Sequence, residues 1–311
     1  MKIFYVWLFV LAAAQAQDLR LGIIGTDTSH AAAFTKTLND EANPEHVTGA
    51  RVVAAYKGGS ADIEESASRV EKYAAELHDK WGVKIVGKIA DLCPLVDGVL
   101  LESVDGRPHL SQFREAVQCA KPVFIDKPLA ATLEDAKAIA QLAKEKNVPW
   151  FSASSLRYSD IENLKSADAI GAMVWGPGPL EPHHQLDMTW YGIHAVEMLY
   201  VLFGNGCVEV SRMKSADEDV ITGRWKDGKL GTVHLQRPCG KFGAVVFLKG
   251  NKLNAEPDIK FSYVPLVKSI VEFMHTNKPA VANEVTMEMF EFMDAAQRSE
   301  AAGGKAMALV Q

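Results

Sequence analysis

Hydrophobic positions in the first half of the chain follow two alternating patterns. Short and almost wholly apolar runs predict buried strands, and each is followed by apolar residues at helical spacing, which predict amphipathic helices. The strands are expected at residues 19–25, 51–56, 83–86, 97–101, 123–125 and 150–152, and the helices at 31–39, 63–80, 108–120 and 133–146. Strand–helix alternation of this kind predicts βαβ units, and therefore a Rossmann-like, doubly wound parallel sheet over residues 18–150.

The pattern changes after residue 151. The stretch Gly176-Pro177-Gly178-Pro179 interrupts the chain, and strand-like segments then follow one another with a hairpin turn at Lys226-Asp227-Gly228-Lys229. The segment 172–175 precedes this break. Strands are expected at 208–213, 219–225, 230–236 and 244–248, and helices at 191–203, 263–275 and 285–302. The fold class is thus α/β, with the parallel domain followed by an α+β domain over 151–311 whose sheet is open and largely antiparallel.

The first 16 residues have a different character from the rest. Lys2 precedes an apolar run over residues 3–14, and Ala14-Gln15-Ala16 fits a small-x-small cleavage site. This arrangement predicts a Sec-type signal peptide over residues 1–16 and a mature chain that begins near Gln17. The run is short for a membrane span, although a membrane anchor is the alternative. We therefore expect an exported protein, periplasmic or secreted, that is not membrane-bound after cleavage.

Composition narrows the classes of partner. The chain has 311 residues, enough for two domains, and its 48% hydrophobic and 23% charged residues are typical of a globular protein. The formal net charge is −6, so no basic field attracts nucleic acid. Four cysteines are widely spaced and contain no CxxC pair: Cys93, Cys119, Cys207 and Cys239. A disulfide is compatible with export, but the sequence does not pair them, and a zinc site built from them is not expected.

The most informative short segment is Asp126-Lys127-Pro128. It follows the apolar run 123–125, and proline cannot donate a ladder hydrogen bond, so the strand ends there. Lys127 is thereby placed at the carboxyl edge of a parallel sheet, which is the edge where ligands bind in open α/β folds.

The order of these features resembles the Gfo/Idh/MocA family, named for glucose–fructose oxidoreductase, inositol dehydrogenase and the rhizopine-catabolism protein. The family's Glu-Lys-Pro motif matches Asp126-Lys127-Pro128, and its histidine after the fourth strand matches His109. Its arginine–aromatic pair at the domain junction matches Arg157-Tyr158, and its catalytic histidine matches His194. The resemblance covers nearly all of the chain after residue 16.

This resemblance implies an NAD(P)-dependent oxidoreductase that acts on a sugar or cyclitol-like polyol. His194 would take the hydroxyl proton while a hydride leaves the carbon, and Lys127 would bind the substrate oxygen and shift the pKa of the histidine. His109, Arg157 and Tyr158 would contact the substrate. The resemblance also implies a homo-oligomer that pairs through the open sheet of the second domain.

The dinucleotide fingerprint departs from the family pattern. Gly-x-Gly-x-x-Gly reads Gly25-Thr26-Asp27-Thr28-Ser29-His30, so only the first glycine is present. Asp27 stands where the backbone must approach a diphosphate, and its charge should repel one. The alternative is that Thr26, Asp27 and Ser29 cap the following helix. The expected cofactor-binding residues for NAD or NADP are Gly25, Thr26, Asp27, Ser29, His30, Lys57, Asp126 and Pro128.

Two of these positions carry their own alternatives. Lys57 replaces the acid that usually binds the ribose, which favours a 2′-phosphate and NADP, or it is a surface lysine. The family's aspartate four residues before the catalytic histidine is Trp190 here, so Asp187 is the candidate for that role.

Further polar and aromatic residues gather just before His194. Glu181, His183, His184 and Asp187 are of the types that bind divalent metals, but their spacing matches no standard metal motif, and we predict no metal site. His183, His184, Trp190 and Tyr191 are expected to contact the substrate instead, and Trp175 is a further residue able to stack on a sugar ring.

Two functions therefore stay open. The first is the oxidoreductase. The second is a redox-silent descendant, either a carbohydrate-binding protein or a lyase or hydrolase that uses the same cleft. The second function is more compatible with Asp27 and Trp190, because proton abstraction beside a carbonyl needs a base and an electrophile but no dinucleotide.

Overall fold

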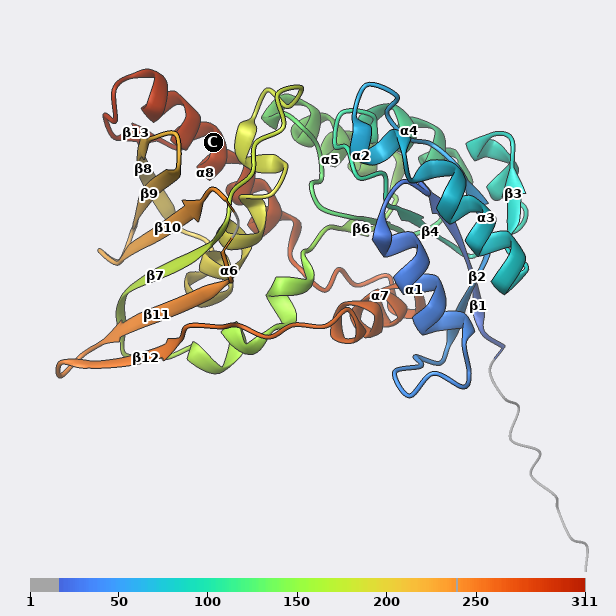
Figure 1. Cartoon of the computed structure of the whole chain (residues 1–311), viewed down its shortest axis with the longest axis horizontal. Coiled ribbons are helices and arrows are strands. Elements are labelled where there is room, and N and C mark those ends of the chain that lie inside the picture. Colours follow the sequence, from blue (N-terminus) through green and yellow to red (C-terminus); the bar gives the residue numbers. More distant parts are fainter. Residues whose placement is uncertain (1–16, 239, 311) are drawn as a thin grey trace, which may run out of the picture.

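The structure is a computed structural model that describes residues 17–238 and 240–310. Two sheets stand side by side, each with helices packed against it (Figure 1). The expected signal peptide over residues 1–16 lies outside the described residues, as does Cys239. Within the described part, no helix is both long and apolar enough to cross a membrane.

The first sheet is parallel throughout and has the strand order β3-β2-β1-β4-β5-β6. Its strands are β1 (Leu19–Ile24), β2 (Ala50–Tyr56), β3 (Lys84–Val86), β4 (Gly98–Leu101), β5 (Val123–Ile125) and β6 (Trp150–Phe151). All residues of β4 and β5 are buried, as expected for strands covered by helices on both faces. The predicted doubly wound sheet is confirmed, and its order reverses between β1 and β4, where the carboxyl ends open a crevice.

The helices of this half are α1 (Ser29–Asn39), α2 (Glu64–Ala67), α3 (Val70–Trp81), α4 (His109–Ala116) and α5 (Leu133–Lys146). The single helix predicted over 63–80 is wrong in one respect, because it is divided between α2 and α3. Ser66 of α2 is buried and its hydroxyl donates to Asp27 in the loop after β1, and the Val70 carbonyl at the start of α3 accepts the Thr26 hydroxyl of the same loop.

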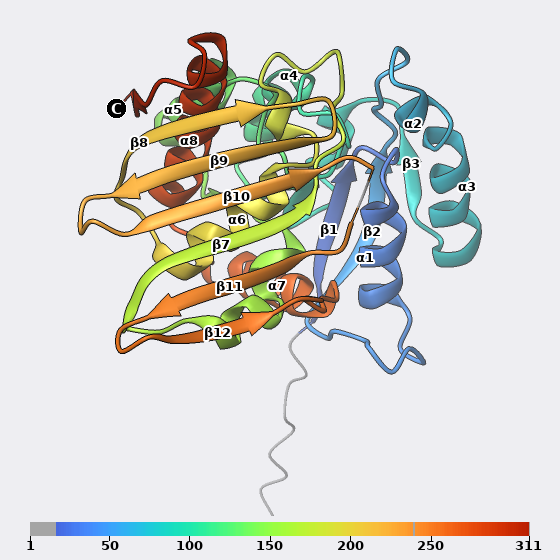
Figure 2. The ribbon, with the colours of Figure 1, turned by 60° about the vertical axis from the view of Figure 1, so that its left-hand side comes forward.

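The second sheet has seven strands in the order β12-β11-β7-β10-β9-β8-β13. They are β7 (Ala169–Pro177), β8 (Cys207–Lys214), β9 (Glu218–Trp225), β10 (Leu230–Gln236), β11 (Gly243–Leu248), β12 (Lys252–Glu256) and β13 (Met307–Ala308). Only β7 and β10 pair in parallel, so the predicted largely antiparallel sheet is confirmed. Figure 2 shows its outer face without a covering helix, and Leu230 and Phe247 lie exposed on it.

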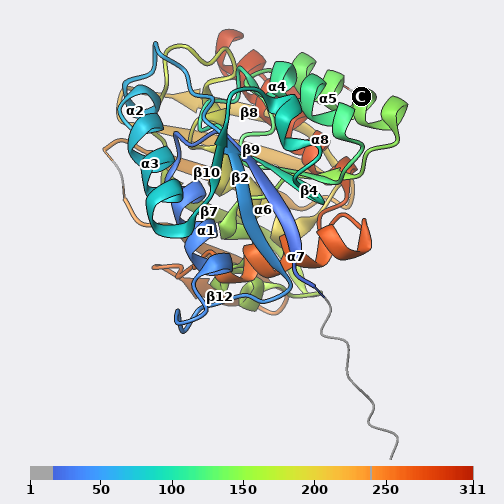
Figure 3. The same ribbon diagram turned by 90° about the vertical axis from the view of Figure 1, so that its right-hand side faces the viewer.

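Three helices complete the second half: α6 (Ile193–Phe203), α7 (Val264–Thr276) and α8 (Asn283–Ala301). Helices α6 and α8 pack on the inner face of the second sheet, and their apolar residues form a continuous core with it. Helix α7 returns to the first sheet, where Leu266 and Ile270 pack among residues of β1, β2 and α1 (Figure 3). The last third of the chain thus fixes the two halves against each other.

The structure pairs Cys93 with Cys119 in a disulfide between the segments that flank β4 and α4. Cys207 is a free and buried thiol, and burial, followed by the charge of Glu288, raises its pKa to about 12. The disulfide is a structural feature of the first half that the cysteine spacing alone did not specify.

Candidate active site

A small pocket lies at the carboxyl edge of the first sheet, where the second half of the chain meets it. Its volume is about 190 Å³. Its lining residues come from α1, α2, the ends of β4 and β5, the segment after β6, the start of α6 and the segment before α7: Thr28, Ser29, His30, Glu65, Arg69, Val104, Asp126, Lys127, Ser155, Leu156, Tyr191, His194, Phe242, Phe261 and Tyr263. A larger groove of about 1120 Å³ near α5 and α8 contains none of the predicted site residues.

Lys127 is held in this pocket by the end of β5. Its ammonium group lies 5.8 Å from the centre of the Tyr191 ring, within the range of a cation–π contact. Burial lowers the pKa of Lys127, against the opposing charges of Asp126 and Glu65. A lysine in this state can bind a substrate oxygen as a donor and can also exchange its proton more readily than an exposed lysine.

His194 enters the same pocket from the first turn of α6. Its Nδ1 lies 2.6 Å from the hydroxyl of Ser154, which also accepts the Leu156 N–H. Burial, followed by the electrostatic interactions with Lys127 and then His30, holds the pKa of His194 well below its ordinary value. The ring is therefore neutral at neutral pH, which is the form that can take a proton.

A second histidine lines the pocket from the first domain. His30 Nδ1 lies 2.5 Å from a carboxylate oxygen of Asp126, and the other oxygen of Asp126 accepts the Lys127 N–H. The His30 ring stacks on Phe34 and meets Tyr263 edge-on, so its orientation is fixed on both sides.

Asp187 does not reach this pocket, and its predicted catalytic role is wrong. Its carboxylate accepts two hydrogen bonds of 2.9 Å from the buried guanidinium of Arg212, and Lys214 binds it at 2.8 Å. These ion pairs hold the pKa of Asp187 below its ordinary value, although burial alone would raise it. The partner of His194 is Ser154, from a segment that sequence order places 40 residues away.

Three residues expected to contact substrate serve the scaffold instead. The ring of His109 is fully buried, and its two nitrogens lie 2.8 Å and 3.2 Å from the backbone carbonyls of Ser103 and Leu129. Arg157 pairs with the buried Glu197 of α6, and Tyr158 packs in the core beside α7. None of the three lines the pocket.

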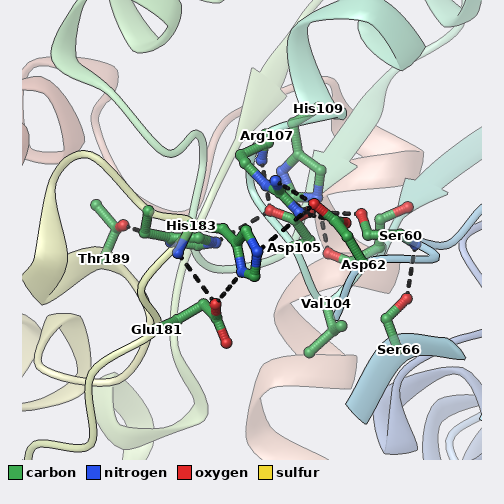
Figure 4. A network of polar contacts seen from close by, with 12 residues as sticks. Ser60, Asp62, Ser66, Val104, Asp105, Arg107, His109, Glu181, His183 and Thr189 are labelled. Carbon is green, nitrogen blue, oxygen red and sulfur yellow. Dashed lines mark hydrogen bonds and ion pairs between the residues drawn. The ribbon is translucent and has the colours of Figure 1, made fainter. Parts of the chain in front are cut away.

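The histidine cluster before α6 belongs to a separate polar network, centred on Asp105 (Figure 4). His184 Nε2 lies 3.0 Å from Asp105, and the ring meets Trp190 edge-on. His183 is largely exposed and binds Glu181 at 2.6 Å. His183, His184, Trp190 and Trp175 do not line the pocket, and of the aromatic residues predicted there only Tyr191 does. Among the described residues, no group of three or more potential ligands is arranged to hold a metal ion.

The fingerprint loop after β1 is closed to a diphosphate. Thr26 and Asp27 have no exposed surface. The Gly25 and Thr26 N–H groups donate to the carbonyls of Tyr56 and Lys57, and Asp27 accepts the Ser66 hydroxyl at 2.6 Å. Burial raises the pKa of Asp27, more strongly than its hydrogen bonds lower it.

Contacts above this loop also join the segments that follow β2 and β4. Gly25, at φ 101°, lies against Ser103, and a Cβ there would collide with the Ser103 backbone. Ser60, after β2, donates to Asp105, after β4, and Asp62 makes two 2.8 Å hydrogen bonds with Arg107. A dinucleotide would have to displace these contacts, so the residues present do not fit NAD or NADP in this conformation.

The other expected cofactor contacts agree with this conclusion. Lys57 binds Glu71 of α3 at 2.6 Å, and Pro128 is buried outside the pocket lining. Ser29, His30 and Asp126 do line the pocket, but they face the space around Lys127.

Two serines that were not predicted lie at the site. Ser155 lines the pocket and Ser154 contacts His194, and both follow β6 at the same carboxyl edge as Lys127, which is the signal that the serine-rich segment 152–155 offered. Tyr263, Phe242 and Phe261 reach the pocket from segments more than a hundred residues beyond Lys127.

The pocket and the two sheets define a two-domain α/β protein whose site combines a lysine and a histidine. Residues 19–154 match the family model GFO_IDH_MocA, described as an oxidoreductase family with an NAD-binding Rossmann fold. This match covers the first domain and agrees with the resemblance predicted from the sequence. No curated protein sequence matches the chain.

Solved structures share the fold over both domains. A probable dehydrogenase from Thermotoga maritima is 19% identical, with a TM-score of 0.72, and the match covers 94% of this chain and 99% of that one. A myo-inositol dehydrogenase from Lactobacillus casei, in complex with NAD(H) and myo-inositol, is 18% identical, with a TM-score of 0.70 and coverage of 95% and 98%. An oxidoreductase from Agrobacterium radiobacter, in complex with NAD+, L-tartaric acid and magnesium, is 16% identical, with a TM-score of 0.71 and coverage of 94% and 99%.

Proposed function

We propose that the chain acts on a small polyhydroxylated compound, a sugar or cyclitol-like polyol or its ketone, by proton transfer at Lys127 and His194. One observation carries this proposal: the two side chains line the same 190 Å³ pocket. Pockets for drug-sized ligands measure about 300–1,000 Å³, so this one suits a smaller molecule. The fold likeness to an enzyme solved with myo-inositol supports the substrate class.

His194 and Lys127 have different roles because their charge states differ. Neutral His194 accepts the proton of a carbon beside a carbonyl through Nε2, because Nδ1 is engaged with Ser154. Lys127 donates a hydrogen bond to the carbonyl oxygen and stabilises the negative charge that develops on it. Tyr191 lies beside both, in cation–π range of Lys127 and edge-on to the ring of His194.

NAD- or NADP-dependent oxidation of the same polyol is the second candidate. The family match over residues 19–154 favours it, as does the presence of the lysine–histidine pair. The buried Asp27 and the contact between Ser60 and Asp105 favour the first proposal, because they cover the fingerprint loop and leave the proton-transfer groups in the pocket.

We further propose that the protein is exported and forms a homo-oligomer. The Cys93–Cys119 disulfide is compatible with an oxidising compartment, as is the apolar segment after Lys2. The uncovered outer face of the second sheet carries exposed apolar side chains, including Met213, Leu230 and Phe247, which suit a second copy of the chain.

A turnover experiment tests the proposed function. Polyols and their ketones are incubated with the purified protein, with and without NAD or NADP, and followed by NMR. We expect turnover of at least one compound without cofactor, and its loss in Lys127→Ala and in His194→Ala. His183→Ala is the matched control, since this histidine lies outside the pocket, and it should retain full activity. Turnover that strictly requires the dinucleotide establishes the second candidate, and unchanged turnover in both pocket variants removes the proposed mechanism.

A further inference from the structure

The second pocket histidine occupies an unusual position in the fold. His30 is the sixth residue of the fingerprint segment that begins at Gly25, where the dinucleotide motif has its third glycine. A glycine is needed there for close packing of helix and strand, so an imidazole changes the space at the start of α1. The His30 side chain points across the carboxyl edge of the sheet to Asp126, at the end of β5.

This contact gives His30 a defined protonation geometry. The Asp126 carboxylate only accepts, so His30 Nδ1 carries the hydrogen of the 2.5 Å bond. Asp126 is fixed in turn by the Lys127 N–H, and the two side chains of the pair are 11% and 3% exposed. Among the described residues, no hydrogen bond reaches Nε2 of His30, and His30 is one of the residues that line the pocket.

The pocket therefore holds two imidazoles from different domains. His30 comes from α1 of the first domain and is backed by a carboxylate, whereas His194 comes from α6 of the second and is backed by a hydroxyl. Lys127 is close enough to lower the pKa of His194, after burial, and His30 contributes in the same direction. The remaining charged groups of the lining are Glu65 and Arg69, which pair with each other.

We propose that His30, positioned by Asp126, is a second acid–base residue of this pocket, and that the substrate is a polyhydroxylated ketone or aldehyde epimerised beside its carbonyl. This inference rests on the proposed function and specifies its chemistry. One imidazole removes the proton from the carbon next to the carbonyl, the C–H electron pair forms a C=C bond, and the carbonyl π pair moves to the oxygen bound by Lys127. The pair then returns to form a new C–H bond with a proton from the other imidazole. Substrate and product have the same oxidation level, so no hydride acceptor takes part.

The test uses the whole purified protein, with 2-keto-myo-inositol and D-fructose as probes in D₂O. NMR follows two quantities, deuterium entry beside the carbonyl and appearance of the epimer. Wild type should show both. His30→Gln should lose epimer formation by about 100-fold or more, the usual contribution of one acid–base group, but keep deuterium entry into the epimer that His194 deprotonates. His194→Gln should show the opposite preference.

Asp126→Asn keeps the His30 imidazole and removes its carboxylate, so epimer formation should slow while binding of the probe persists. This variant separates a positioning role from a folding defect, and thermal unfolding of each variant provides the folding control. Epimer formation at the wild-type rate in His30→Gln overturns the inference. A wild-type protein that binds the probes without deuterium entry also overturns it and leaves the proposed substrate class standing. Absence of binding to any polyol or ketone overturns the proposed function itself.

Discussion

The polar network around Asp105 allows a stringent test of the claim that one buried carboxylate joins three parts of the chain. Asp105 has 1% of its side chain exposed and accepts hydrogen bonds from Ser60, from Arg107 and from His184. These donors come from the loop after β2, the loop after β4 and the segment before α6, so one carboxylate joins three parts of the chain.

The size of the expected effect follows from burial. An exposed ion pair contributes at most about 1 kcal/mol, whereas removing one partner of a buried pair costs about 3–5 kcal/mol. Asp105→Asn should therefore lower the free energy of unfolding by about 3 kcal/mol or more. Asp62→Asn is a matched control, because Asp62 binds the same Arg107 but is 53% exposed, and it should cost less than about 1 kcal/mol.

The effect should also depend on pH in a defined direction. Burial alone would raise the pKa of Asp105, but hydrogen bonds from His184, Arg107 and Ser60 outweigh it and hold the pKa well below its usual value. Its stabilisation is therefore fully present above the unfolded pKa near 3.8 and is lost as the pH falls through the folded value. Urea unfolding at pH 7 and at successively lower pH measures both quantities. Equal losses in Asp105→Asn and Asp62→Asn at pH 7 would refute the reasoning.

Three further predictions concern other parts of the molecule. The double substitution Cys93→Ser, Cys119→Ser should destabilise the protein by about 3.5 kcal/mol in urea unfolding, because the disulfide closes a 26-residue separation; a loss below about 1 kcal/mol would contradict this. Glu102→Gln should raise the free energy of unfolding at pH 7, and this gain should vanish below pH 4.5. Burial, followed by the charges of Asp126 and Asp27, raises the pKa of Glu102, and neither of its carboxylate oxygens has a partner among the described residues. A loss of stability at pH 7 would contradict this prediction. Leu230→Glu should convert an oligomer into a monomer in light scattering, since this side chain is 51% exposed on the uncovered sheet face; an unchanged mass in an oligomeric protein would exclude this face as the interface.

The sequence predicted the elements whose formation depends on local pattern. The apolar runs of β4 and β5 identify buried strands, and the proline after Lys127 marks the end of β5. The segments Lys252–Glu256 and Met307–Ala308 are short, and each forms a strand by pairing with a neighbour at an edge of the second sheet. Alternation is weak at such edges, so these two strands were missed.

The same distinction applies to the site. Lys127 and His194 could be placed from motif order, and the structure brings them into one pocket. Asp187 could not be excluded from the sequence, because its true partner, Arg212, lies on β8 and the pairing depends on tertiary packing. Ser154 was missed for the same reason, since a hydroxyl 40 residues from its histidine partner carries no periodic signal.

The residues that replace the fingerprint glycines both make buried contacts. Asp27 binds Ser66 of α2, and His30 binds Asp126, which directly follows β5. Each departure thus makes a specific buried contact, which is what a loop adapted to a new role requires.

Calorimetric titration of the purified protein with NAD+, NADP+ and myo-inositol in one buffer tests the central claim most directly. The account predicts saturable heat with a polyol or its ketone, its loss in Lys127→Ala, and no binding of either dinucleotide at millimolar concentration. Saturable binding of NAD+ or NADP+ to the wild-type protein, with no binding of any polyol or ketone in its absence, would contradict the account.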